Sequence, residues 1–166
     1  MIKQTLNWYE GEIFEAKFIL AFGIAIVIIA FLFRYFGNTP YAKALLIPLL
    51  VAGLIISLIG SLMLMSNQRK METVEQNFMN DNEQFAKSEK QRVEDFQYLY
   101  PLSLGISVVC FFLTFIFLAF TKNMYLHASA IAIALFGLTF IIIDYFSKER
   151  ANIYYEQINH FLLQYQ

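Results

Sequence analysis

Residues 102–120 read LSLGISVVCFFLTFIFLAF, a run of 19 residues without a charged side chain. An α-helix needs about 20 mostly apolar residues to cross the hydrocarbon core of a bilayer. Three further windows, residues 18–36, 41–65 and 125–146, meet the same requirement. The sequence therefore predicts an all-α integral membrane protein with four transmembrane helices.

The composition of the whole chain also favours a lipid environment. Of its 166 residues, 58% are hydrophobic and 15% are charged, whereas a soluble domain has about 45–50% apolar and about 25% charged residues. The net charge is -1 and no long basic run occurs, so no nucleic-acid partner is expected. Cys110 is the single cysteine, which excludes an intrachain disulfide, a CxxC redox pair and a thiolate zinc site.

Two short polar connections pair the four windows. Residues 37–40 separate the first two windows, and residues 121–123 separate the last two. Such short connections join antiparallel helices. We therefore expect two tandem helical hairpins, at residues 18–66 and 100–146, joined by a polar segment at residues 67–99.

Prolines mark the expected beginnings and irregularities of the helices. Thr39 suits an N-cap and Pro40 the first helical position, where its missing N–H costs nothing. Pro101 is expected to begin the third span in the same way. Pro48 falls inside the second window, so a kink is predicted near the outer end of that helix.

The distribution of basic residues predicts the orientation. Nine of the 12 Lys and Arg residues lie on the side that carries both termini and the segment 67–99. Because cytoplasmic loops are enriched in Lys and Arg, we expect this side to be cytoplasmic in the cell (inner) membrane. The basic residues of the other side are Arg34, Lys43 and Lys122.

The three polar segments, residues 1–17, 67–99 and 147–166, are predicted to be amphipathic cytoplasmic helices, here called the arms. Their apolar residues recur at helical spacing: Ile2, Leu6, Tyr9 and Ile13; Met71, Val74, Phe78 and Phe85; Val93, Phe96 and Tyr100; and Tyr154, Ile158, Phe161 and Tyr165. A turn is expected at residues 80–82. The arms either form a bundle continuous with the spans or lie flat in the interface, and the bundle is favoured.

The two halves of the chain also resemble each other. At an offset of roughly 81–84 residues, Gly23 falls on Gly105 and Gly53 falls on Gly137. Each half contains an even number of spans, so the halves have the same orientation in the membrane. The sequence thus predicts a 2+2 parallel duplication, unlike the inverted repeats of many transporters.

Small and polar residues recur within the spans. Gly53, Ser57 and Ser61 follow one another at spacings of four in the second span, and Ser107 and Thr114 lie in the third. These residues either let helix backbones approach closely or line a polar path for a substrate. Helix packing is the favoured interpretation, because no charged group joins the stripe.

Asp144 is the one carboxylate inside a predicted span. Ionisable groups within a membrane are costly and often functional, but Asp144 could also reach the headgroup region and pair with Lys148, one turn further on. His127 and His160 lie far apart, and neither a zinc-binding spacing nor a Walker loop nor a GxSxG elbow occurs. No catalytic residue, metal or cofactor is therefore predicted.

One segment resembles a known family. Arg92 and the run Tyr98-Leu99-Tyr100-Pro101-Leu102 are similar to a segment of the MAPEG family of four-span, trimeric glutathione-handling enzymes, in which an Arg, an Asn and a Glu precede an aromatic-Pro-Leu helix start. The Asn and Glu of the family are absent here. The segment also follows the second span, whereas in the family it lies between the first and second.

Three functional hypotheses follow from these observations. The first is a non-enzymatic accessory, scaffolding or self-associating membrane component, which acts through helix–helix contacts with its own copies or with a partner membrane protein. The second is an oligomeric small transporter or channel in which Asp144 is the ionisable group. The third is a MAPEG-like four-span enzyme. The lipid bilayer is the only partner that all three share.

Overall fold

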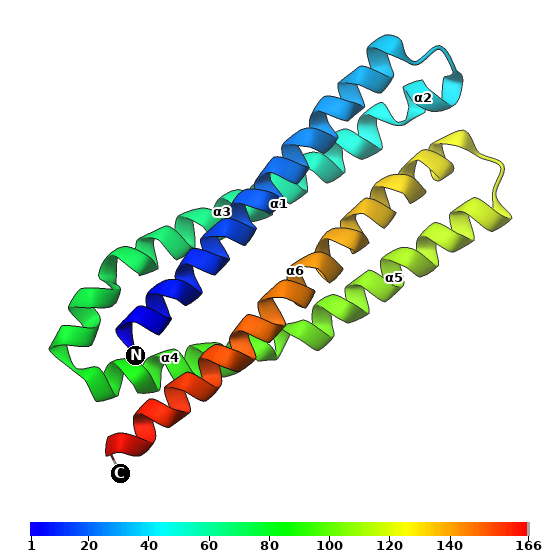
Figure 1. Cartoon of the computed structure of the whole chain (residues 1–166). Helices are drawn as coiled ribbons and strands as arrows, with labels where there is room; N and C mark the ends of the chain where they lie inside the picture. Colours follow the sequence, from blue (N-terminus) through cyan, green and yellow to red (C-terminus); the bar gives the residue numbers. More distant parts are fainter. Residues whose placement is uncertain (166) are drawn as a thin grey trace.

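The computed structural model describes residues 1–165, apart from the side chain of Tyr165. The predicted place of Tyr165 in an apolar stripe and the last residue of the predicted arm 147–166 therefore lie outside the described part. Within it every regular element is a helix (Figure 1). The elements are α1 (Ile2–Phe36), α2 (Pro40–Ala44), α3 (Leu46–Asn80), α4 (Asn82–Gln97), α5 (Leu99–Phe120), α6 (Met124–Leu162) and the 3-10 turn η1 (Leu163–Tyr165).

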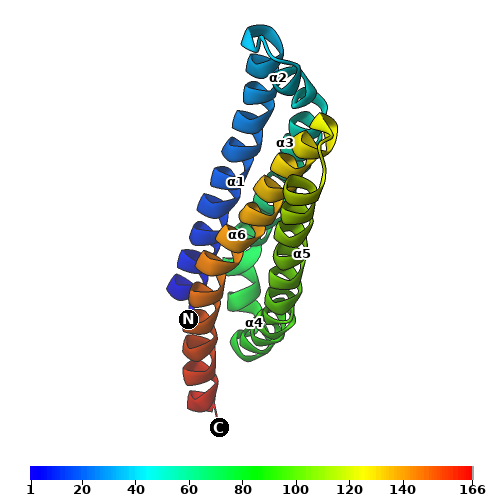
Figure 2. The same cartoon turned by 90° about the vertical axis from the view of Figure 1, so that its right-hand side faces the viewer.

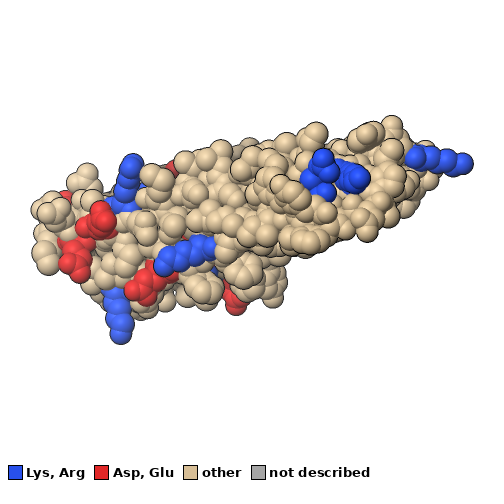
Figure 3. Space-filling view, turned by 90° about the horizontal axis from the view of Figure 1, so that it is seen from above, with Lys and Arg blue, Asp and Glu red and all other residues tan. Residues whose placement is uncertain are grey.

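The predicted all-helical fold with four apolar helical stretches is confirmed. Four helical stretches are long and apolar enough to cross a membrane: α1, α2 with α3, α4 with α5, and α6. Charged side chains gather toward the ends of the molecule (Figure 3). Acidic side chains in this view lie only over the half that contains the arms, while the opposite end carries basic ones.

The helix break near Pro48 agrees with the predicted kink. α2 ends at Ala44 and α3 begins at Leu46. Pro48 has no N–H with which to bond the carbonyl of Ala44, four residues earlier, so the helix is interrupted there. The predicted cap is also confirmed, because the Thr39 hydroxyl accepts a hydrogen bond of 3.2 Å from the backbone N–H of Ala42.

Pro101 has the same effect one hairpin later. α4 ends at Gln97, four residues before Pro101, and α5 begins at Leu99. The prediction that Pro101 would be the first residue of the third span was therefore wrong by two positions, because its fixed φ is tolerated throughout a first helical turn. The predicted turn at residues 80–82 is confirmed, with Asp81 capping α4 through a 2.9 Å bond from the Gln84 N–H.

The spans form an open arrangement rather than a closed ring. α1 and α3 run side by side, and α6 lies between this pair and α5 (Figures 1 and 2). α6 packs on α1, α3, α4 and α5, whereas α5 packs on α6 and, at its beginning, on α4. In the described residues α5 has no extensive contact with α1 or α3, so the four long apolar helices do not surround a common interior.

Two hydrophobic cores hold the molecule together. The span core contains Ile19, Ile26, Ala30, Leu49, Ala52, Ile56 and Ala132. The arm core contains Trp8, Tyr9, Val74, Phe85, Val93, Tyr100, Ala151, Tyr154 and Ile158. The arms thus pack against one another as extensions of the long helices, which agrees with the bundle interpretation. On α1 the buried face differs from the predicted stripe, because Trp8 and Glu12 are buried and Ile13 is only half-buried.

Glycines set the distance between α1 and α3. A Cβ atom on Gly23 would lie 2.5 Å from the backbone nitrogen of Ser57 and 2.9 Å from the carbonyl oxygen of Gly53. A Cβ atom on Gly60 would lie 2.6 Å from the backbone nitrogen of Leu20. The two backbones therefore touch where only glycine fits, as small residues permit in membrane helices.

Candidate functional site

A buried group of charges lies where the arms meet the predicted spans. Glu12 and Glu15 of α1 face Arg150 of α6, and we call these three residues the Arg150 cluster. Arg150 Nη2 lies 3.0 Å from Glu12 Oε1 and also donates to Glu15 Oε2. The side chains of Glu12 and Glu15 are 4% and 7% exposed, so both carboxylates are nearly removed from water.

The Arg150 cluster holds one cation between two carboxylates. Burial raises the pKa of Glu15 to about 7; the neighbouring Glu12 adds to this rise, and Arg150 opposes it. Burial also raises the pKa of Glu12, although Arg150 lowers it. Among the described residues, Glu15 Oε1 and Arg150 Nε are buried without a hydrogen-bond partner. Two carboxylates thus share one cation, and burial makes both of them weaker acids than exposed glutamates.

A second charged group, here called the Glu89 cluster, lies in the arm core. Glu89 of α4 accepts two hydrogen bonds from Arg92, of 3.1 Å from Nε and 2.6 Å from Nη2. The hydroxyls of Tyr9 and Tyr154 donate to the same carboxylate at 3.4 Å and 2.9 Å. Burial is the largest cause that raises the pKa of both tyrosines, so they remain hydrogen-bond donors at neutral pH.

Arg92 is also covered by aromatic rings. Its guanidinium carbon lies 5.0 Å from the ring centre of Tyr9 and 5.9 Å from that of Trp8. Trp8 in turn stacks on Tyr154 at 5.2 Å between ring centres. Arg92, which carries the similarity to the MAPEG family, is thus held by the Glu89 carboxylate and by the rings of Trp8 and Tyr9.

Hydrogen bonds extend from the Arg150 cluster toward the spans. The Ser147 hydroxyl lies 3.5 Å from Glu12 Oε1 and 3.2 Å from the hydroxyl of Tyr100. The next residues in this direction are Ser103 of α5 and Asp144 of α6, and the Ser103 hydroxyl donates to the Asp144 carboxylate. Polar groups of α1, α5 and α6 therefore follow one another along the helix boundary.

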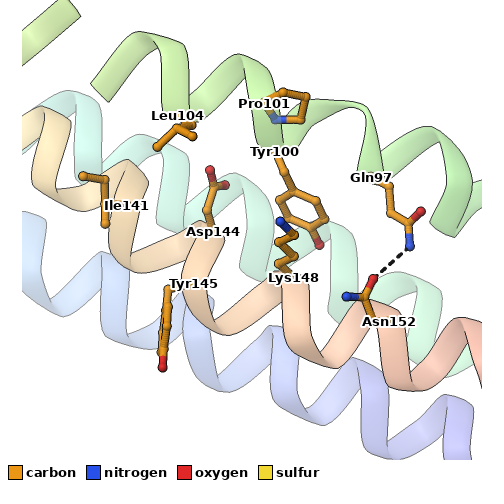
Figure 4. Close-up of a pocket in the computed structure, with 9 residues that line it drawn as sticks. All are labelled: Gln97, Tyr100, Pro101, Leu104, Ile141, Asp144, Tyr145, Lys148 and Asn152. Carbon is orange, nitrogen blue, oxygen red and sulfur yellow. Dashed lines mark hydrogen bonds between the residues drawn. The ribbon is translucent and has the colours of Figure 1, made fainter. Parts of the chain in front are cut away.

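Asp144 does not pair with Lys148 in the described part of the chain, where no ion pair joins the two side chains. Both instead line a cavity of about 520 Å³. Figure 4 shows them one turn apart on α6, on the side that faces Tyr100 and Leu104 of α5.

The predicted residues of the third span lie against α6. The Ser107 hydroxyl contacts the carbonyl oxygen of Gly137 at 3.1 Å, and the Thr114 hydroxyl contacts that of Ala130 at 3.1 Å. Both hydroxyls also approach carbonyls of their own helix, four residues earlier. These residues are positioned as contacts between α5 and α6.

The predicted residues of the second span have two different surroundings. Gly53 and Ser57 lie at the close approach to α1 described above. The Ser61 hydroxyl donates to the carbonyl of Ser57 in its own helix at 2.8 Å. The structure thus brings Gly53 and Ser57 together with Gly23, and it keeps them apart from Asp144, which lies on the other hairpin.

Sequence reasoning missed the two charged clusters, although a signal was present. Glu89 stands four residues after Phe85 and four before Val93, so a charge occupies the middle of an apolar stripe. Glu12 occupies the corresponding place between Trp8 and Ala16 on α1. A charged residue on the buried face of an arm indicates a partner elsewhere in the fold, because unpaired buried charges are very costly.

The described residues contain no group of three His, Cys, Asp or Glu side chains placed to hold a metal ion. Comparisons with family models, with curated proteins and with solved structures found no match to this chain.

Proposed function

We propose that this protein is a non-catalytic membrane component that acts through helix–helix contacts, as a self-associating unit or as a subunit of a larger assembly. The observation that carries the proposal is the position of α5 at the edge of the molecule. Its hydroxyl-bearing face is used by α6, whereas its opposite face carries the exposed residues Val108, Phe112 and Phe115.

The proposal is also supported by how the polar groups are used. Glu89 and Arg92 bond each other and the surrounding tyrosines, and the hydroxyls of Ser107 and Thr114 contact neighbouring backbone. A rigid helical body with a free apolar edge is suited to association within a bilayer, where close packing of helices drives assembly.

Association through α5 can be tested by fluorescence energy transfer between labelled copies in liposomes. The chain should associate as the protein-to-lipid ratio rises, and the double variant Phe112→Ala and Phe115→Ala should associate less. Leu54→Ala with Leu58→Ala provides the matched control, because these exposed residues form an equivalent pair on α3. Equal transfer by all three proteins, or none by the unmodified protein, would count against self-association through α5.

A second candidate function, an ion or proton pathway through an oligomer, is favoured by one observation. Polar groups follow one another from Asp144 through Ser103, Tyr100 and Ser147 to Glu12. The open arrangement of the spans means that a second copy has to complete such a path. The test is proton flux into liposomes that contain the protein. Flux by the unmodified protein that is lost in a folded and assembled Asp144→Asn variant would favour transport over a purely structural role.

The enzyme hypothesis receives no support from the position of Arg92. This residue is held by Glu89 and by aromatic rings inside the arm core. A ligand would have to displace these contacts before it could use the guanidinium.

We further propose that the arms and both termini are cytoplasmic and that the hairpins arose by duplication. The charge asymmetry of the sequence supports the orientation. Reporter fusions at Asn38, Asn80 and Gln166 should read outside, inside and inside. An outside signal at Asn80 would reverse the assignment.

A further inference from the structure

The cavity beside Asp144 combines charged, polar and apolar side chains in its lining. It lies where α4, α5 and α6 meet and has a volume of about 520 Å³. Its apolar wall consists of Pro101 and Leu104 from α5 and of Ile141 from α6. Its charged side chains are Asp144 and Lys148, both from α6 (Figure 4).

The two charges of this cavity are arranged as a pair of opposite sign. Asp144 and Lys148 are four residues apart on one helix, which places their Cβ atoms about 5–6 Å from each other. The Ser103 hydroxyl donates to the Asp144 carboxylate and holds it in place. Among the described residues no ion pair within 4.0 Å engages Lys148, although its charge attracts the Asp144 carboxylate on the same helix.

One end of the cavity is lined by neutral side chains. Gln97 of α4 donates a hydrogen bond of 3.3 Å to Asn152 of α6, as Figure 4 shows. The amide groups bond each other and add no further charge to the cavity. The site therefore presents one anion and one cation beside an apolar wall.

The predicted spans place this cavity at the boundary between hydrocarbon and water. Asp144 lies near the end of the window 125–146, and Pro101 immediately precedes the window 102–120. Lys148, Gln97 and Asn152 lie on the arm side of the same boundary. Lipid headgroups occupy this depth of a bilayer, and their acyl chains begin just below it.

We propose that this cavity binds the headgroup of a phospholipid that carries both a phosphate and a primary ammonium, as phosphatidylethanolamine does. Lys148 donates to the phosphate, Asp144 accepts from the ammonium, and the first acyl carbons lie along Leu104 and Ile141. A primary ammonium offers N–H donors to the carboxylate, which a quaternary ammonium lacks. This inference does not depend on the proposed function.

The experiment measures lipid binding to the full-length protein in a non-ionic detergent by native mass spectrometry. Phosphatidylethanolamine, phosphatidylcholine and phosphatidylglycerol with identical acyl chains are added separately, and free phosphorylethanolamine tests a soluble source of the same headgroup. Phosphatidylethanolamine should bind most tightly, and free phosphorylethanolamine should not bind at the same concentrations. Equal binding of phosphatidylglycerol, or equally tight binding of the free headgroup, would overturn the proposal.

Two charge variants locate the site. Lys148→Gln should weaken the binding of phosphatidylethanolamine and of phosphatidylglycerol by about tenfold, as loss of a charge-assisted hydrogen bond predicts. Asp144→Asn should remove the preference for phosphatidylethanolamine and leave phosphatidylglycerol binding unchanged. Lys122→Gln and Glu149→Gln are the matched controls outside the cavity and should bind as the unmodified protein does. Unchanged binding by both cavity variants would overturn the assignment.

A third variant tests the apolar wall without altering any charge. Leu104 is 57% exposed, so Leu104→Trp can be accommodated without repacking a core. The larger ring should fill the space beside Ile141 and reduce phosphatidylethanolamine binding. Circular dichroism and the elution volume in detergent establish that each variant is folded. A folded Leu104→Trp variant with undiminished binding would place the lipid elsewhere.

Discussion

The same substitution should have opposite effects at two glycines that the predicted duplication aligns. At Gly23 an added Cβ would lie 2.5 Å from the backbone nitrogen and the hydroxyl oxygen of Ser57, and 2.9 Å from the carbonyl oxygen of Gly53. At Gly105 an added Cβ meets no atom within 4 Å. Gly23→Ala must therefore separate α1 from α3, whereas Gly105→Ala must disturb nothing.

The magnitudes follow from these contacts. A backbone nitrogen cannot rotate away as a side chain can, so overpacking at Gly23 should cost about 1–3 kcal/mol. Replacing glycine by alanine inside a helix returns roughly 0.5–1 kcal/mol at either position. The net result is a destabilisation of up to about 2.5 kcal/mol for Gly23→Ala and a stabilisation of about 0.5–1 kcal/mol for Gly105→Ala.

The assay is unfolding by sodium dodecyl sulfate in mixed micelles, followed through the fluorescence of Trp8, the single tryptophan. Because Trp8 lies in the arm core, its emission should shift when the helices separate. Adding Ser57→Gly to Gly23→Ala should restore only part of the stability, because the backbone nitrogen of residue 57 remains in place. Changes of the same sign in Gly23→Ala and Gly105→Ala would refute the reasoning.

Two further predictions concern the arms. The pKa of Glu15 is raised to about 7 from an ordinary value of 4.5. Between these two pH values the folded state therefore holds a proton that the unfolded state has released. The stability that this proton contributes is complete below about pH 4.5 and is lost as the pH rises through 7. Glu15→Gln should therefore be more stable than the unmodified protein at pH 8, by at most about 3 kcal/mol. Its stability should depend less on pH in chemical unfolding, with the contribution of Glu12 remaining; an unchanged slope would contradict the prediction. The rings of Phe78 and Phe85 pack edge to face, with 5.8 Å between their centres. Phe85→Ser should therefore destabilise the arm core by about 3 kcal/mol. Proteolysis between Glu72 and Lys90 should become faster as a result. Met79→Ser, at a residue 78% exposed, should leave the cleavage rate unchanged, and equal rates for the two variants would contradict the prediction.

The helical class and the number of apolar stretches could be predicted from the sequence because each depends on local composition alone. Pro48 and Pro101 also interrupt the helices for a local reason, since each lacks the N–H that would bond the carbonyl four residues earlier. These features require no knowledge of which helices are neighbours.

The charged clusters could not be predicted because they depend on pairings across the fold. Glu12 and Arg150 are 138 residues apart, and nothing in the sequence near either residue identifies the other as its partner. The same limit applies to Gly23 and Gly105, which occupy equivalent places in the predicted repeat. Their surroundings differ because α1 meets α3 closely, whereas α5 lies at the edge.

The length of α6 has a mechanical consequence. Its 39 residues form one uninterrupted α-helix of about 58 Å, nearly twice the thickness of a hydrocarbon core of about 30 Å. A helix without a joint transmits tilt and rotation along its whole length. The helical stretch formed by α2 and α3 is interrupted at Leu45, and the stretch formed by α4 and α5 is interrupted at Tyr98. A displacement of the N-terminal end of α6 must therefore also move Tyr154 and Ile158. The two interrupted stretches can instead bend at Leu45 and at Tyr98 and absorb part of such a movement.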